Sequence, residues 1–150
     1  MTSGRFTVDE KALELDNQVC FPLYSAANAV IRAYRPLLLE IDLTYSQYLV
    51  MMVLWKTNGI NVKELGNKLH LDSGTLTPLL KRLEGKGLVS RKRGLDDERV
   101  RMLYVTEQGL ELRKKALLVP NGMVCKLNMD VEELIELKRL CEKLLSKLND

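Results

Sequence analysis

The 150-residue sequence predicts a mainly α-helical fold with one small β-hairpin. Apolar residues recur at helical spacing over most of the chain, and two short β-branched or apolar stretches flank one glycine- and aspartate-containing turn. The composition, 46% hydrophobic and 29% charged, is that of an ordinary globular protein. The longest uninterrupted apolar run, Tyr48 to Trp55, has eight residues, whereas a membrane-spanning helix needs roughly 20.

The first 60 residues predict two helices. Apolar residues spaced three and four apart predict a helix from about Glu10 to Tyr34. Pro22 either kinks this helix or marks its start, and Pro36 ends the segment or opens a short new one. The motif Thr44-Tyr-Ser-Gln47 is a capping box, and it predicts a second helix over Tyr45–Trp55, which Asn58-Gly59 ends.

Two short helices and a hairpin follow in the middle of the chain. Val62–Leu69 predicts one helix, and Asp72-Ser73-Gly74 is a turn and cap signal before the next, Thr75–Lys86, which Gly87 ends. Two short helices joined by so tight a turn are typical of a helix-turn-helix. Residues 88–93 and 100–105, around a turn at Gly94–Glu98, predict the hairpin.

The C-terminal third predicts two more helices. Thr106 caps the first, from about Glu107 to Leu118, and the sequence Pro120-Asn121-Gly122 breaks it. The last helix extends from about Val131 to Leu148. Its apolar stripe consists of Leu134, Leu137, Cys141, Leu144 and Leu148.

Positive charge is concentrated in the middle of the chain, although the net charge is only +3. Residues 1–61 carry five Lys or Arg against six Asp or Glu, residues 62–101 carry ten against six, and residues 102–150 carry eight of each. A basic segment in an otherwise balanced chain favours contact with an anionic partner such as nucleic acid. The alternative is a solvated basic face.

The elements and charges together predict a winged helix-turn-helix with N- and C-terminal dimerisation helices, in a single chain of residues 1–150. Residues 60–106 form the predicted winged DNA-binding region, and residues 10–57 and 107–150 form the helical dimerisation and sensing region. Long helices at both ends carry apolar stripes far apart in the sequence, which favours a homodimer. The alternative is that these stripes pack within one subunit.

The remaining residue types argue against several functional classes. Cys20, Cys125 and Cys141 have no CxxC spacing and His70 is the single histidine, so we expect no disulfide framework and no metal site. His70 is predicted to be a structural residue at a helix end. We see no phosphate-binding loop and expect no cofactor. The N-terminus lacks a secretory pattern, so we expect reduced thiols, a cytoplasmic location and no membrane association.

The hairpin and the next helix contain the pattern Asp97-x-Arg99-x-x-x-Leu103-x-Val105-Thr106-x-x-Gly109. This pattern resembles the wing signature of the multiple-antibiotic-resistance regulator (MarR) family. The stretch LDSGTLTPLLKRLEGKGLVSRKR, residues 71–93, is similar to the recognition helix and first wing strand of the organic-hydroperoxide-sensing (OhrR) branch. The stretches LDNQVCFPLYSA, YRPLL and LTYSQYLVMMVLW extend the resemblance to nearly the whole chain.

The predicted DNA contacts lie on the second helix of the helix-turn-helix and on the wing. Hydroxyl side chains in the first turn suit base edges or phosphates in a major groove, and two later cations suit phosphates. The resemblance implies that the wing-tip Arg99 enters the adjacent minor groove and that Asp97 holds its guanidinium. On a near-palindromic double-stranded operator, the predicted contacts are Ser73, Thr75, Thr77, Lys81, Arg82, Arg91, Lys92, Arg93, Asp97 and Arg99.

Cys20 is the predicted redox sensor, although a cysteine on an apolar helix stripe is usually a small buried hydrophobe. Tyr24 follows one turn later, Tyr34 lies nearly four turns further along the same face if the helix is continuous, and Tyr45 opens the next helix. In the branch that the chain resembles, tyrosine hydroxyls from both subunits donate to the sensing sulfur, which implies Tyr34 and Tyr45 here. Tyr24 is also predicted to hydrogen-bond the thiolate. Such bonds stabilise a thiolate, which an organic hydroperoxide oxidises to sulfenic acid.

The other two cysteines have separate predicted roles. Cys125 follows the VPNG break, and the resemblance to two-cysteine members implies a resolving cysteine that forms a disulfide with Cys20 across subunits. The alternative is a free thiol at a loop–helix junction. Cys141 matches no family role and is predicted to pack in the core or the dimer interface.

The sequence thus predicts a DNA-binding repressor, and not an enzyme, that releases DNA when organic hydroperoxides oxidise Cys20. One alternative is a MarR-type repressor controlled by a small phenolic ligand, with Cys20 incidental. Another is a thiol peroxidase using Cys20, but no TxxC or CxxC motif surrounds Cys20 and the basic wing would be unexplained. A third is a purely structural helical protein.

Overall fold

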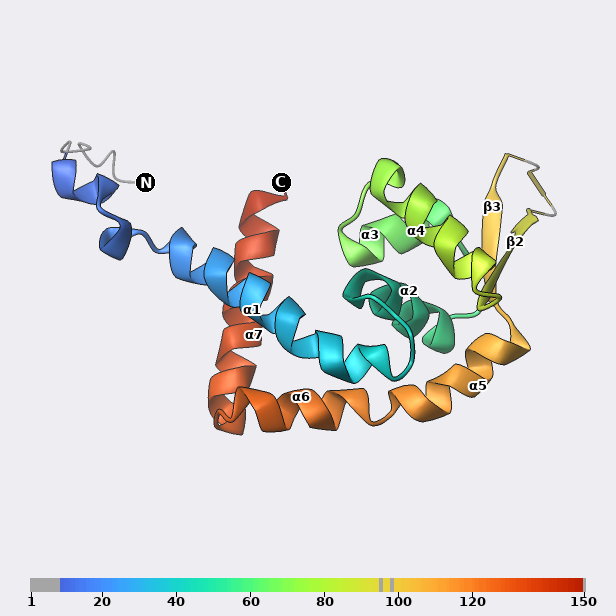
Figure 1. Cartoon of the computed structure of the whole chain (residues 1–150). Coiled ribbons are helices and arrows are strands. Elements are labelled where there is room, and N and C mark those ends of the chain that lie inside the picture. The colour runs from blue at the N-terminus through green and yellow to red at the C-terminus, as the bar shows by residue number, and fades with distance from the viewer. Residues whose placement is uncertain (1–8, 95, 98, 150) are drawn as a thin grey trace.

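The computed structural model describes residues 9–94, 96–97 and 99–149 and shows a mainly helical chain with a small antiparallel sheet (Figure 1). This confirms the predicted fold class. Two 3-10 turns, Glu10–Leu13 and Leu15–Asn17, come first. The helices are α1 (Cys20–Leu39), α2 (Tyr45–Lys56), α3 (Val62–Leu69), α4 (Ser73–Gly85), α5 (Glu107–Ala116), α6 (Val119–Leu127) and α7 (Val131–Leu148). The strands are β1 (Ile60–Asn61), β2 (Val89–Arg93) and β3 (Arg101–Val105).

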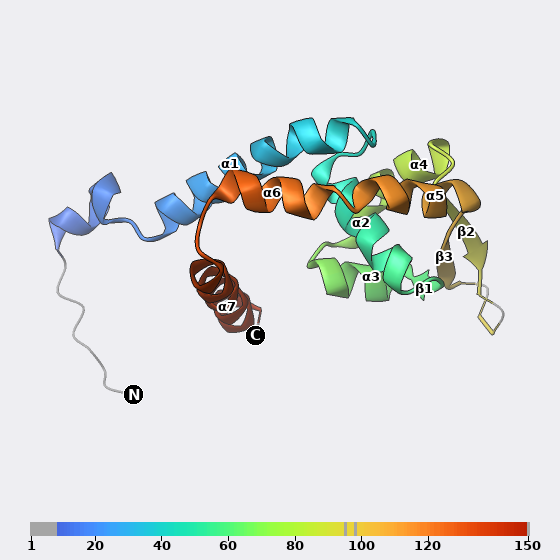
Figure 2. The same cartoon turned by 90° about the horizontal axis from the view of Figure 1, so that it is seen from below.

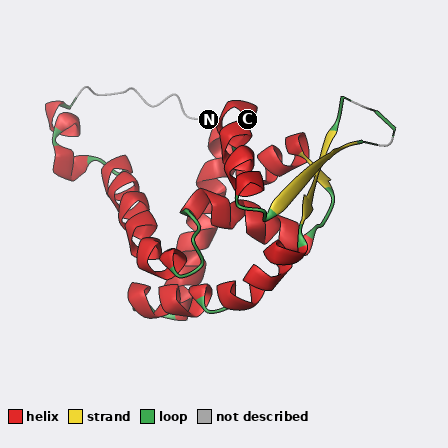
Figure 3. Ribbon diagram, turned by 45° about the vertical axis from the view of Figure 1, so that its right-hand side comes forward, coloured by secondary structure: helices red, strands yellow, loops and turns green. Residues whose placement is uncertain are grey.

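The wing is a three-stranded antiparallel sheet in the order β1-β3-β2. Strands β2 and β3 form the predicted hairpin, which projects beyond the helices (Figure 3). The turn predicted at Gly94–Glu98 includes Leu95 and Glu98, which lie outside the described residues. The sequence does not predict β1, which pairs Ile60 with Leu103, because two residues are too few to show strand alternation.

The core lies between α2, α4 and the sheet. Three residues of α2, Val50, Met51 and Leu54, are fully buried. They belong to one cluster with Leu76, Leu80 and Leu83 of α4 and Leu103 of β3. Helix α2, which the sequence assigns to the helical region, therefore shares its core with the winged region. The division of the chain into functional regions stays a prediction.

Local capping signals in the sequence are confirmed. Thr44 Oγ1 accepts the backbone amide of Gln47 at 3.3 Å, and the Gln47 side chain accepts the amide of Thr44 at 3.1 Å. Thr106 caps α5. His70 ends α3 in the left-handed conformation with φ 55°, so it is the structural helix-end residue expected. Gly87, with φ 77°, follows α4 as predicted.

The first predicted helix is wrong at both ends. Residues 10–17 form two 3-10 turns, and α1 starts only at Cys20. Pro22 therefore lies in the first turn of α1, where its missing N–H removes no helical hydrogen bond. Pro22 therefore marks the start, one of the two predicted outcomes. Pro36 does not end the segment, because α1 continues through it to Leu39. Leu38, which is fully buried in the core, holds that last turn.

The Pro120-Asn121-Gly122 break is also misplaced. The helical conformation is interrupted at residues 117–118, between α5 and α6. Pro120 lies in the first turn of α6. Helix α6 runs along α1 (Figures 1 and 2). A Cβ on Gly122 would lie 2.7 Å from the Leu37 side chain, and Lys126 Nζ donates to the Ala33 carbonyl at 2.7 Å. The two helices are therefore packed closely and antiparallel.

Helix α7 projects away from the layer formed by α1 and α6 (Figure 2). None of its residues, all of which are described, is buried. Its exposed apolar side chains include Ile135, Leu137, Leu140, Leu144, Leu145 and Leu148. The predicted C-terminal stripe therefore does not pack within the subunit. Within the described residues, no helix has the length and apolar character to span a membrane.

Candidate functional site

Helix α4 presents one polar face and one buried face. Its apolar residues Leu76, Leu80 and Leu83 are buried in the core. The opposite face is exposed and carries the five predicted DNA contacts of this helix. They are Ser73, Thr75, Thr77, Lys81 and Arg82.

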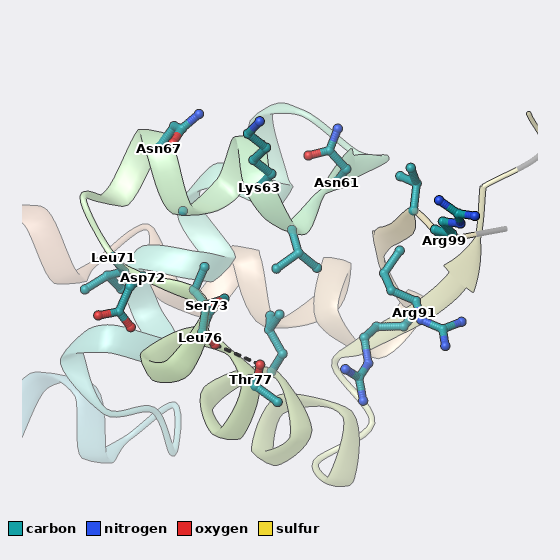
Figure 4. Close-up of a pocket in the computed structure, with 15 residues that line it drawn as sticks. Asn61, Lys63, Asn67, Leu71, Asp72, Ser73, Leu76, Thr77, Arg91 and Arg99 are labelled. Atoms are coloured by element: carbon teal, nitrogen blue, oxygen red, sulfur yellow. Dashed lines mark hydrogen bonds between the residues drawn. The ribbon is translucent and has the colours of Figure 1, made fainter. Parts of the chain in front are cut away.

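The first turn of α4 is stabilised by hydrogen bonds of its own side chains. Asp72 Oδ1 accepts the backbone amide of Thr75 at 2.8 Å, and this bond is the main reason that the pKa of Asp72 is below its ordinary value. A charged Asp72 also favours the helix N-terminus. Thr77 Oγ1 donates to the Ser73 carbonyl at 2.8 Å (Figure 4). The Thr77 hydroxyl therefore keeps only its acceptor capacity for an outside partner.

A cleft of about 610 Å³ opens between α3, α4 and the wing (Figure 4). Asn61, Lys63 and Asn67 line it from the α3 side, Ser73 and Thr77 from α4, and Arg91, Arg99 and Arg101 from the wing. The polar residues of α3 were not among the predicted contacts. The exposed positions of Lys63 and Asn67, one helical turn apart, are the signal that could have identified them.

The predicted cations of the wing differ in their surroundings. Arg91 forms an ion pair with Glu84 of α4, and both side chains are about two-thirds buried. This pair ties the wing to α4 and partly neutralises Arg91. Lys92 Nζ lies 5.3 Å from the centre of the Tyr104 ring, and Arg93 is exposed.

Asp97 and Arg99 are in contact at the wing tip through a backbone hydrogen bond. Asp97 Oδ1 accepts the backbone amide of Arg99 at 3.0 Å. In the part of the wing that the structure describes, no ion pair joins this carboxylate to the Arg99 guanidinium. That Asp97 holds the Arg99 guanidinium therefore stays a prediction. The Arg99 side chain is exposed beside the cleft.

Three tyrosines cluster where α1 meets α2. The ring centroids of Tyr34 and Tyr45 are 4.7 Å apart, and the Tyr48 ring lies 6.0 Å from Tyr34 and 6.4 Å from Tyr45. Burial raises the pKa of all three phenols, and their mutual charge repulsion adds to the pKa increase of Tyr34 and Tyr48. All three therefore remain protonated at neutral pH and are able to donate hydrogen bonds.

Cys20 is far from this cluster within the chain. It is the first residue of α1 and is exposed. Tyr34 lies fourteen residues further along the continuous helix, which corresponds to about 21 Å at 1.5 Å per residue. Tyr24 is one turn from Cys20 and is 67% exposed. The structure thus brings Tyr34 and Tyr45 together, but it brings neither of them to the Cys20 of the same chain.

The other cysteines lie on the C-terminal helices. Cys125 is exposed and lies inside α6, so the alternative of a thiol at a loop–helix junction is wrong. Its neighbour Lys126 bonds to Ala33, thirteen residues along α1 from Cys20, or about 20 Å. Cys141 is half-buried on α7. Within the described residues, no group of three or more metal-ligating side chains is close enough to hold an ion.

The helix-turn-helix and its basic wing define a DNA-binding protein of the winged-helix class. A family profile described as transcriptional regulator SarA/Rot matches residues 32–116. The chain is 41% identical over 137 residues to the organic hydroperoxide resistance transcriptional regulator of Bacillus subtilis (strain 168), and the match covers 91% of this chain and 93% of that relative. The chain belongs to the MarR family of winged-helix transcriptional regulators, and is therefore a DNA-binding transcriptional regulator.

Two solved structures of AbfR, a protein of Staphylococcus epidermidis, are also similar. Reduced AbfR bound to DNA is 33% identical with a TM-score of 0.79, over 95% of this chain and 97% of that one. AbfR with its disulfide formed is 34% identical with a TM-score of 0.61, over 93% and 92% of the two chains. The described conformation therefore resembles the reduced, DNA-bound form of AbfR more than the disulfide form.

Proposed function

We propose that this regulator is a homodimeric repressor that binds a near-palindromic operator and releases it when an organic hydroperoxide oxidises Cys20. The observation that carries the proposal is the placement of an exposed Cys20 at the start of α1, in a chain similar to a named organic hydroperoxide resistance regulator.

Dimerisation is supported by the apolar surface that one chain leaves uncovered. Helix α7 has no buried residue, and most of its leucines are between about 40% and 70% exposed. Val19, Phe21 and Leu23 at the start of α1 are also exposed. Contiguous apolar surface of this kind marks an interaction site in a globular protein, and a second copy would cover both regions symmetrically.

The tyrosine cluster supports the same arrangement. Tyr34 lies about 21 Å along α1 from the Cys20 of its own chain and Tyr45 stacks beside Tyr34, so these two hydroxyls reach a Cys20 sulfur only across the dimer. Both phenols have a raised pKa and stay protonated. We assign them the role of donors to the thiolate of the other subunit, with Tyr24 beside that sulfur on its own helix.

The proposed chemistry proceeds in two balanced steps. The Cys20 thiolate attacks the terminal oxygen of the hydroperoxide, the O–O bond breaks, and the alkoxide leaves and takes up a proton to become an alcohol. The Cys125 thiolate of the partner then attacks the sulfenic sulfur, and hydroxide leaves as water after protonation. Sulfur is oxidised and the peroxide is reduced, with no cofactor.

In the reduced state, the exposed face of α4 would enter the major groove and the wing would lie along the adjacent backbone. Ser73, Thr75 and Thr77 are assigned to base edges and phosphates, and Lys81, Arg82, Lys92 and Arg93 to phosphates. Arg99 is assigned to the minor groove, with Asp97 shaping its turn. Arg91 acts through its ion pair with Glu84, which holds the wing against α4.

The test is a titration of a duplex operator, selected from random sequences with reduced protein, before and after treatment with tert-butyl hydroperoxide. We expect peroxide to weaken binding at least tenfold in wild type and to leave Cys20→Ser unaffected, because serine forms no thiolate. Release from Cys20→Ser would instead point to control by a small ligand. Repeated consumption of peroxide with a thiol reductant, without any change in DNA binding, would indicate a peroxidase.

A further inference from the structure

The C-terminal end of α4 is bonded to the turn between α1 and α2 by one lysine. Lys86 is the C-cap residue of α4. Its ammonium donates to Gln47 Oε1 at 3.0 Å and to the backbone carbonyl of Asp42, and it lies 3.7 Å from the Asp42 carboxylate. All three oxygens belong to the first turn of α2 or to the turn before it. Helix α4, the proposed recognition helix, is thus bonded to the segment 42–47, which contains Tyr45 of the tyrosine cluster.

Gln47 is a rigid acceptor for this lysine. Among the residues that the structure describes, it is the one buried polar side chain, with 2% exposed. Its Oε1 atom already accepts the amide of Thr44 at 3.1 Å in the capping box of α2. A buried side chain held in this way cannot turn toward solvent without losing its hydrogen bonds. Any movement of the start of α2 therefore moves the acceptor of Lys86.

The backbone of Asp42, which also contacts Lys86, has an unusual conformation. Its φ is 52°, in the left-handed region that residues other than glycine rarely adopt. Such a backbone persists only when surrounding contacts hold it. The bond from Lys86 to the Asp42 carbonyl is one of those contacts.

The contact is next to the proposed sensor tyrosines. Tyr45 directly follows Thr44 in the sequence, and its ring is 4.7 Å from that of Tyr34. Tyr45, Asp42 and Lys86 line one cavity of about 710 Å³ between the end of α1 and the start of α2. Tyr45 therefore lies within one helical turn of Asp42 and Gln47, the residues that accept hydrogen bonds from Lys86.

We propose that Lys86 is a positioning residue that couples the orientation of the recognition helix to the state of the thiol–tyrosine sensor. The proposal rests on the proposed function. When oxidation changes the hydrogen bonds of Tyr34 and Tyr45, the turn at Asp42 and Gln47 shifts, and Lys86 carries that shift to the end of α4. Apolar contacts between α2 and α4 hold the fold, whereas Lys86 supplies the directional, polar part of the connection.

The test compares operator binding by Lys86→Met with that by wild type. Methionine keeps the aliphatic stem and removes the ammonium, while Gln47 Oε1 stays bonded to Thr44, so no buried acceptor is left unpaired. We expect the ratio of Kd after tert-butyl hydroperoxide treatment to Kd before it to fall about tenfold. The rate of Cys20 oxidation should stay at the wild-type value, and the Tm should fall slightly, because one contact of the left-handed Asp42 is lost.

Two control variants separate coupling from loss of a charge. Lys86→Arg keeps a cationic donor and should restore most of the ratio. Lys115→Met removes an exposed cation from α5, away from the α2–α4 junction, and should leave the ratio unchanged. If Lys86→Met fails to fold, Asp42→Asn removes the carboxylate but keeps a residue tolerated at positive φ, and it should lower the ratio in the same direction.

The outcomes that overturn the proposal are distinct. A wild-type ratio in Lys86→Met refutes the coupling alone. Equal weakening of both redox forms, with a salt dependence reduced by about one phosphate contact, shows that Lys86 contacts DNA directly. If wild-type protein itself binds the operator equally before and after peroxide, the proposed function fails and the coupling fails with it.

Discussion

Oxidation by tert-butyl hydroperoxide should join Cys20 of one subunit to Cys125 of the other, and not to Cys125 of the same chain. Within one chain, Cys125 lies near Ala33 of α1, because the adjacent residue Lys126 donates a hydrogen bond to the Ala33 carbonyl. Thirteen residues of helix, about 20 Å, separate that level from Cys20. A disulfide needs Cα atoms within about 7 Å, so an intrachain bond would require α6 to slide roughly 13 Å along α1.

Close packing opposes such a slide. Gly122 lets α6 approach Leu37 so closely that even an added Cβ would lie 2.7 Å from that side chain. The oxidised product should therefore migrate on a non-reducing gel at twice the 17.1 kDa mass of the chain. Cys20→Ser and Cys125→Ser should each abolish this species, and a mixture of the two variants should recover part of it in heterodimers. Cys141→Ser is the matched control and should cross-link like wild type.

Peptide mapping decides between the possible products. A Cys20–Cys125 peptide from the band of double mass is the expected result. The reasoning would be refuted by a monomeric band that carries an intrachain Cys20–Cys125 bond, or by a Cys20–Cys141 peptide. If Cys125→Ser still releases DNA fully on oxidation, the protein works with Cys20 alone and Cys125 is not a resolving residue.

The remaining predictions test the sensor tyrosines, the wing, two glycines and the pH dependence of stability. Tyr34→Phe and Tyr45→Phe should each slow alkylation and oxidation of Cys20 about tenfold, because a hydrogen bond to a charged group contributes about 1.5 kcal/mol; unchanged rates in the double variant would remove the phenols from the mechanism. Arg99→Ala should weaken operator binding at about 150 mM salt without lowering the Tm, since Arg99 is exposed, and wild-type affinity would contradict the wing assignment. Gly109→Ala should destabilise the fold by about 1–3 kcal/mol in urea titrations, because its Cβ would lie 2.5 Å from the Leu88 carbonyl oxygen; Gly85→Ala, with no atom within 4 Å, should instead stabilise it by about 0.5–1 kcal/mol. Burial raises the pKa of Tyr34 and Tyr45 above 10.0, so the folded state binds these protons more tightly than the unfolded state; their stabilising effect is complete below about pH 10 and is lost as pH rises through the folded-state values. The Tm should therefore fall above pH 10, and less so in the Tyr34→Phe, Tyr45→Phe double variant.

Local signals were sufficient for the helix-turn-helix and its caps. The bounds of α3 match the expected range, and the cap residues Asp72, Thr44 and Thr106 have the predicted roles. Each of these features depends on residues three or four positions apart. Proline was the main source of error, because its effect depends on where a helix happens to begin. Pro22 and Pro120 lie in first turns, where no hydrogen bond is lost, and Pro36 is tolerated beside a buried Leu38.

The candidate site was predictable only in its composition. The sequence indicated which side chains carry charge, a thiol or a phenol. It gave no indication that Arg91 pairs with Glu84 or that Asp97 accepts the backbone amide of Arg99. Lys63 and Asn67 line the same cleft as the wing arginines, although their spacing of one helical turn was the only local sign of a shared face. These pairings depend on the direction of side chains from separate elements, which periodicity does not encode.

The sequence by itself determined the fold class, the helix-turn-helix with its β-hairpin wing, and the presence of a cysteine followed by tyrosines, but it predicted neither β1 nor α6. Only the tertiary structure decided that Tyr34, Tyr45 and Tyr48 form one cluster, that Cys125 lies inside a helix packed along α1, and that α7 is left uncovered. The physical reason is range. Turns, caps and amphipathic faces follow from neighbours along the chain, whereas distances between sites follow from how helices of fixed length pack against one another.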